Sequence, residues 1–79
     1  MSFNEQQLDE LALRLLRCIV ETTGQKTFTG GQIMCPAQTD PSWTFTAGNI
    51  ALNHALKRDW AIEVPNSNTY MVKLLSPQG

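Results

Sequence analysis

The sequence predicts a small α+β domain in which three helices are followed by a C-terminal two-stranded β-hairpin, with a short strand between helices one and two. Three observations lead to this prediction: a long amphipathic segment at the N-terminus, a later helical segment that ends near residue 58, and two alternating segments around a turn after it. Hydrophobic residues make up 42% of the 79 residues and charged residues 16%, which suits a globular core. We therefore expect residues 1–79 to form a single domain.

The first helix is predicted from Glu5 to Thr22. Its apolar residues recur every three or four positions, which is the period of an amphipathic helix: Leu8, Leu11, Ala12, Leu15 and Ile19. Asn4 is a suitable N-cap, and Gly24 stands just past the last periodic residue, where helices commonly stop.

A short strand and a short second helix are predicted next. Residues 26–28 suggest an extended segment, and Thr29 offers an N-cap hydroxyl to a helix that starts at Gly30. Pro36 restricts Cys35 to extended geometry, so this helix should end near Cys35 unless the proline kinks it. The stretch from Pro36 to Ser42 is then a loop.

The third helix has two possible starts and one clear end. Asp40-Pro41 could cap it with proline in the first turn, or Thr46 could cap it later. The helical period stops after Arg58, and the alternating segments 61–64 and 70–74 flank turn residues 65–68, which predicts the hairpin. Residues 76–79 are expected to form a flexible tail.

The order helix, strand, helix, helix, hairpin is that of a winged helix-turn-helix. The segment from Thr46 to Val64 resembles the recognition helix, tight turn and first wing strand of small winged-helix DNA-binding regulators. In that family a glycine commonly occupies the turn where this chain has Asp59, and aspartate also adopts the left-handed conformation. The resemblance extends over about residues 8 to 75. It implies a winged-helix fold that binds duplex DNA through its third helix, as a small transcriptional regulator or a DNA-processing accessory protein.

A polar stripe on the third helix supplies the candidate readers of DNA. The helical period puts Thr46, Asn49, Asn53 and Lys57 on one face with Ile50 beside them, while Gly48, Ala51, Leu52, Ala55 and Leu56 fall on the other side. Asparagine amides pair with adenine, and an isoleucine contacts a thymine methyl group. His54 lies at the edge of the stripe, as a phosphate ligand or simply a half-exposed side chain. With the cations added, the candidate DNA-binding residues are Thr46, Asn49, Ile50, Asn53, His54, Lys57, Arg58 and Lys73.

The charge balance opposes DNA binding, because the formal net charge is −1 and phosphate neutralisation supplies most non-specific affinity. The acidic residues Glu5, Asp9, Glu10 and Glu21 are concentrated in the first helix, so the acidic and reading surfaces could be separate. The alternative function is a winged-helix adaptor that binds another protein and no DNA.

Other functional classes have little support in the sequence. There is one histidine, no Gly-rich phosphate loop and no recognised nucleophile-base motif, so we expect no enzyme activity and no cofactor. Cys18, Cys35 and His54 lack the paired spacing of a metal module, so no metal is expected. No apolar stretch approaches the roughly 20 residues that span a bilayer, and the cysteine pattern favours a reduced cytoplasmic setting.

A second apolar set on the first helix suggests self-association. Leu13, Leu16 and Val20 recur at helical spacing on a flank of the core face. Either the hairpin or the C-terminal tail covers them, or they form an exposed strip. In the second case we expect a homodimer with these three residues at its interface, which would bring two reading helices to one DNA site.

Overall fold

The computed structural model describes residues 3–73, which form an α+β domain with three helices and one three-stranded antiparallel sheet. This architecture is compatible with a winged-helix-like class, and it confirms the predicted helix count, the short strand between helices one and two, and the C-terminal hairpin. The predicted tail at 76–79 and the last residue of the second alternating segment, Leu74, lie outside the described residues.

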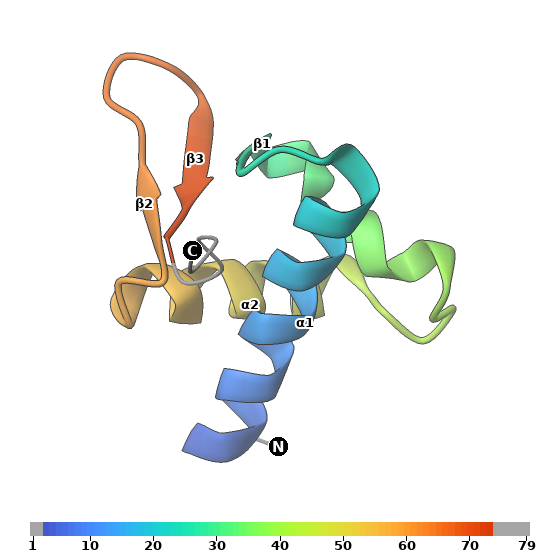
Figure 1. The fold of residues 1–79 in the computed structure, drawn as a ribbon. Helices are drawn as coiled ribbons and strands as arrows, with labels where there is room; N and C mark the ends of the chain where they lie inside the picture. The colour runs from blue at the N-terminus through green and yellow to red at the C-terminus, as the bar shows by residue number, and fades with distance from the viewer. Residues whose placement is uncertain (1–2, 74–79) are drawn as a thin grey trace.

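Helix α1 runs from Glu5 to Thr23, close to its predicted bounds (Figure 1). The Asn4 side chain accepts a hydrogen bond from the Gln7 backbone N–H at 2.8 Å, and the Gln7 side chain accepts one from the Asn4 N–H at 3.0 Å. This reciprocal pair satisfies two N–H groups that have no partner within the helix. Gly24 ends the helix with a φ of 70°, the left-handed geometry that glycine adopts without a Cβ penalty.

Strand β1 (Thr27–Thr29) leads directly into η1 (Gly30–Gln38), a 3-10 helix of nine residues. Thr29 is its N-cap residue, and the Thr29 N–H is satisfied by the Gln32 side chain at 2.8 Å. The predicted stop near Cys35 is wrong because η1 continues through Pro36. Pro36 is buried, and its carbonyl accepts hydrogen bonds from the N–H groups of residues 39 and 40, so packing and a closing turn hold the proline within the helix.

Helix α2 (Phe45–Lys57) starts at neither of the two predicted positions. Thr44 is its N-cap and accepts a hydrogen bond from the Ala47 N–H at 3.1 Å. Asp40 instead closes the preceding turn, where its carboxylate accepts hydrogen bonds from the Ser42 hydroxyl at 2.6 Å and the Ser42 N–H at 3.0 Å. These hydrogen bonds, reinforced by Arg14 at 2.6 Å, hold the pKa of Asp40 below its usual value.

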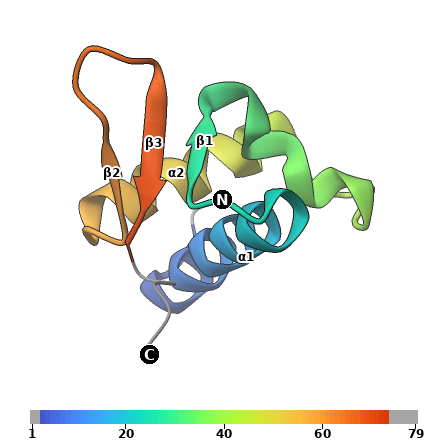
Figure 2. The ribbon, with the colours of Figure 1, turned by 45° about the horizontal axis from the view of Figure 1, so that its top comes forward.

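The hairpin consists of β2 (Ala61–Glu63) and β3 (Thr69–Val72) and follows α2 after a tight turn. Asp59 takes a φ of 64° in that turn, the left-handed conformation that aspartate adopts more readily than most residues. Strand β3 lies at the centre of the sheet, between β1 and β2, and pairs antiparallel with both. The tip of the hairpin projects away from the helices (Figures 1 and 2).

The core lies between α1, α2, η1 and the sheet. It is built from buried apolar residues of every element: Ala12, Leu15, Leu16, Ile19, Phe28, Ile33, Trp43, Ala51, Leu52, Ala55, Ala61 and Val72. The Trp43 indole donates a hydrogen bond to the Ile33 carbonyl at 2.9 Å, which fixes the loop after η1. Gly48 lets α2 approach η1, since a Cβ there would lie only 2.6 Å from the Ile33 carbonyl oxygen.

Candidate nucleic-acid interface

Helix α2 has one buried face and one solvent face. Gly48, Ala51, Leu52 and Ala55 are buried against the core. The solvent face carries Thr46, Asn49, Asn53 and Lys57 as exposed side chains, with Ile50 half-buried at its edge. The core contacts anchor the helix, so these polar side chains are presented together on a rigid element.

Phe45 borders this face, one helical turn before Asn49, and sequence reasoning missed it. Its side chain is 58% exposed at the first position of α2. It was overlooked because neither predicted helix start makes Phe45 the first residue of the helix. Periodicity alone could not have revealed it, because Phe45 is in line with Leu52 and Leu56 by helical spacing; the signal is the good N-cap at Thr44, which makes Phe45 the first residue of the helix. An exposed aromatic ring therefore borders the polar face at the N-terminal end of α2.

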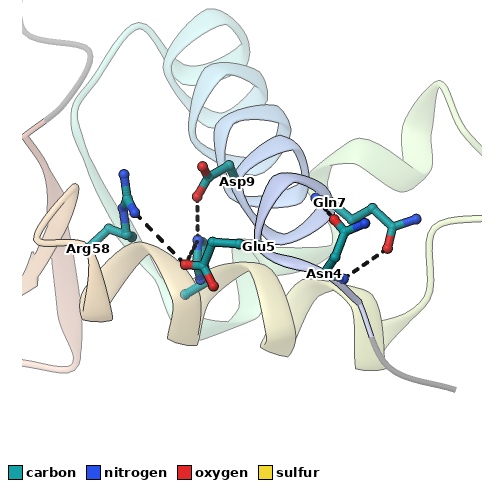
Figure 3. Close-up of polar contacts among 6 residues, drawn as sticks. Asn4, Glu5, Gln7, Asp9 and Arg58 are labelled. Carbon is teal, nitrogen blue, oxygen red and sulfur yellow. Dashed lines mark hydrogen bonds and ion pairs between the residues drawn. The ribbon is translucent and has the colours of Figure 1, made fainter.

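The assignment of His54 to the DNA-binding face is wrong. Its side chain is buried, with 4% of the residue exposed, and its Nε2 lies 2.6 Å from Asp9 Oδ1. Trp60 packs edge-on against the imidazole, with ring centroids 5.9 Å apart. In Figure 3 the Asp9 and Glu5 side chains extend from α1 toward α2. His54 thus joins α1 to α2, and burial with a carboxylate partner removes it from contact with phosphate.

Glu5, Asp9 and His54 form the one group of potential metal ligands among residues 3–73, with donor atoms all within 4.8 Å of one another. These ligand atoms already have partners within the protein. The Asp9–His54 separation of 2.6 Å is that of a hydrogen bond, and the Arg58 guanidinium lies 3.8 Å from Glu5. The cluster acts as a polar bridge between the two helices, with a cation at its rim (Figure 3).

Two of the predicted phosphate contacts already have acidic partners. Arg58 lies 3.8 Å from Glu5 and stacks 5.0 Å above the Trp60 ring, while Lys73 lies 3.0 Å from Asp59. Both ion pairs are on the surface, where such pairs are worth about 0 to 1 kcal/mol. A phosphate group could therefore replace the carboxylate at small cost.

The three residues predicted at a dimer interface do not form an exposed strip. Leu16 is fully buried in the core and is excluded from any interface of the folded domain. Val20 is half-buried and packs against the same core. Leu13 is half-buried in a shallow depression shared with Arg14 and Arg17. The apolar residues of α1 cover more than one narrow face of the helix, which contacts both α2 and η1.

Comparisons with known proteins assign no family. No protein-family model matches the chain, and neither a curated protein nor a solved structure is detectably similar to it. Within residues 3–73, no helix has both the length and the apolar character needed to cross a membrane.

Proposed function

We propose that this domain is a winged-helix-like module that binds duplex DNA through the solvent face of α2. The observation that carries the proposal is the separation of the two faces of this helix. Asn49, Asn53 and Lys57 are exposed along one side, whereas the other side is anchored in the core. The hairpin follows the C-terminal end of α2 and projects from that end of the helix (Figure 1). A recognition helix followed by a wing is the order that the resemblance to winged-helix proteins implies.

The side chains on this face have the chemistry of major-groove recognition. An asparagine amide donates one hydrogen bond to an adenine edge and accepts another, and each well-formed pair of this kind discriminates between bases. Lys57, at the C-terminal end of the face, would contact phosphate, a contact that positions the helix without reading sequence. The hairpin tip carries Asn66, Ser67 and Asn68 and no cation, so its contribution is hydrogen bonding to the backbone.

The affinity of one copy for DNA should be low and only weakly dependent on salt. The cations of the later segments, Lys26, Lys57, Arg58 and Lys73, allow at most about four phosphate contacts, so log affinity should fall against log salt with a slope of about 3 to 4. Fluorescence anisotropy with a labelled random duplex at several salt concentrations measures this slope. Binding that is absent at low salt would contradict DNA recognition, and a slope near 8 would contradict a single copy with these contacts.

A protein-binding adaptor is the second candidate, and Phe45 is the observation that favours it. Aromatic residues are enriched at protein interfaces, and Phe45 has 58% of its surface exposed, one helical turn before Asn49. The pairing of Arg58 with Glu5 and of Lys73 with Asp59 also reduces the positive potential of this region. The same anisotropy measurement separates the two candidates, because an adaptor of this kind has no affinity for duplex DNA at low salt.

A further inference from the structure

The fold brings together two cysteines that are far apart in the sequence. Cys18 lies in α1 and Cys35 lies in η1, and their Sγ atoms are 2.8 Å apart. Both side chains are half-buried free thiols. Two sulfur atoms at this separation are closer than an ordinary van der Waals contact, and only a small adjustment separates them from bonding distance.

The surroundings of the pair favour access by a small reagent. Cys18 lines one surface depression together with Arg17 and Glu21, and Cys35 lines another together with Gln32. Thr22 borders both depressions, and its hydroxyl lies 3.5 Å from the Cys35 sulfur and 3.8 Å from the Cys18 sulfur. The thiols are therefore approached from solvent on two sides and are not sealed in the core.

We propose that Cys18 and Cys35 are a redox modification site, at which a low-molecular-weight disulfide of the glutathione class closes a reversible intramolecular disulfide between α1 and η1. One cysteine thiolate attacks a sulfur of the reagent, which forms a mixed disulfide and releases one glutathione thiolate. The second cysteine, once deprotonated, attacks the mixed disulfide at the protein sulfur and releases the second glutathione. The two protein thiols are oxidised and one reagent disulfide is reduced to two thiols.

The reaction should be faster at alkaline pH. Burial of the thiol is the main cause that raises the pKa of Cys18 above its usual value, and the hydrogen bond with Cys35 is the second. The thiolate is the reactive form. Because the pKa of Cys18 is raised, the thiolate fraction is small at neutral pH and grows as the pH rises toward that pKa. The oxidation test is accordingly run at a pH of about 8.5 or above, since about 8.5 is the pKa of a free cysteine thiol.

A disulfide between Cys18 and Cys35 would restrain η1, which packs against α2. The loop between the two cysteines connects α1 to η1 through β1, and Ile33 of η1 packs against Gly48 of α2. A disulfide that closes a loop of this length restricts the unfolded chain, which should raise Tm by roughly 10 to 20 °C for a small domain.

The test uses the full chain, first reduced with dithiothreitol and then incubated with oxidised glutathione. We expect both thiols to disappear together, the intact mass to fall by two hydrogens with no glutathione retained, and dithiothreitol to reverse the change. The matched controls Cys18→Ser and Cys35→Ser should each retain one glutathione, because the resolving thiol is missing.

Three outcomes would overturn the proposal. They are two glutathiones retained by the native chain, disulfide-linked dimers in place of the internal bond, or two thiols that stay free after prolonged incubation. A Tm of the oxidised chain equal to or below that of the reduced chain would also contradict it, since the bond would then distort the native arrangement of α1 and η1.

Discussion

Leu16→Ala should lower the free energy of unfolding by about 2 to 5 kcal/mol. Leu16 is fully buried in the core, so truncation removes apolar contacts and leaves a cavity that the neighbouring helices only partly fill. A chain of 79 residues has a total stability on the order of 4 to 12 kcal/mol, so the loss is a large share of it. Urea denaturation followed by circular dichroism measures the change.

Leu13→Ala is the matched control for this experiment, because it changes the same residue type on the same helix at a half-buried position. We expect Leu13→Ala to cost about 1 kcal/mol or less, as is common for substitutions outside the core. If Leu16→Ala left stability unchanged but altered sedimentation of the native protein, Leu16 would lie in an interface between copies and not in the core.

Gly48→Ala should destabilise the domain by about 1 to 3 kcal/mol, although alanine normally favours a helix interior over glycine by roughly 0.5 to 1 kcal/mol. The sign is set by the contact with η1. The new Cβ would lie 2.6 Å from the Ile33 carbonyl oxygen and 3.0 Å from Ile33 Cβ, and a backbone atom cannot move aside as the end of a long side chain can. Thermal denaturation of the purified variant measures the effect.

Gly31→Ala is the control, since its Cβ would meet nothing closer than Thr29 Oγ1 at 3.9 Å, an ordinary contact. Its Tm should stay close to that of the native chain or rise slightly. A Tm for Gly48→Ala at or above the native value would show that α2 and η1 do not pack at this distance.

Local signals were sufficient to predict much of the fold. The cap at Asn4, the stop at Gly24 and the apolar period between them determine α1 without help from the rest of the chain. The turn at Asp59 and the alternating segments likewise predict the hairpin. These features depend on neighbouring residues, so a sequence pattern records them directly.

The errors occur where tertiary contacts decide the outcome. Pro36 remains inside η1 because it is buried, and Asp40 is unavailable as a helix cap because it binds Ser42 and Arg14. His54 turns inward to a carboxylate of another helix, 45 residues away in the sequence. Helical spacing places a residue on a face but does not show which partner that face meets.

The pairing of the two cysteines was missed for the same reason. Cys18 and Cys35 meet only because η1 packs along α1. Their separation of 17 residues has no motif that sequence reasoning could use.

Base reading by α2 is tested most directly by comparing Asn53→Ala with Lys57→Ala on two DNA ligands, a duplex enriched by selection from a random library and the unselected library itself. Both side chains are exposed on the same face, and neither belongs to the core, so both variants should fold. Asn53→Ala should weaken binding to the selected duplex by about 1 to 3 kcal/mol and leave binding to the library nearly unchanged. Lys57→Ala should weaken both similarly and reduce the salt slope by about 1.

If neither Asn53→Ala nor the companion variant Asn49→Ala changes affinity for the selected duplex, the solvent face of α2 does not read DNA and the proposed function is contradicted.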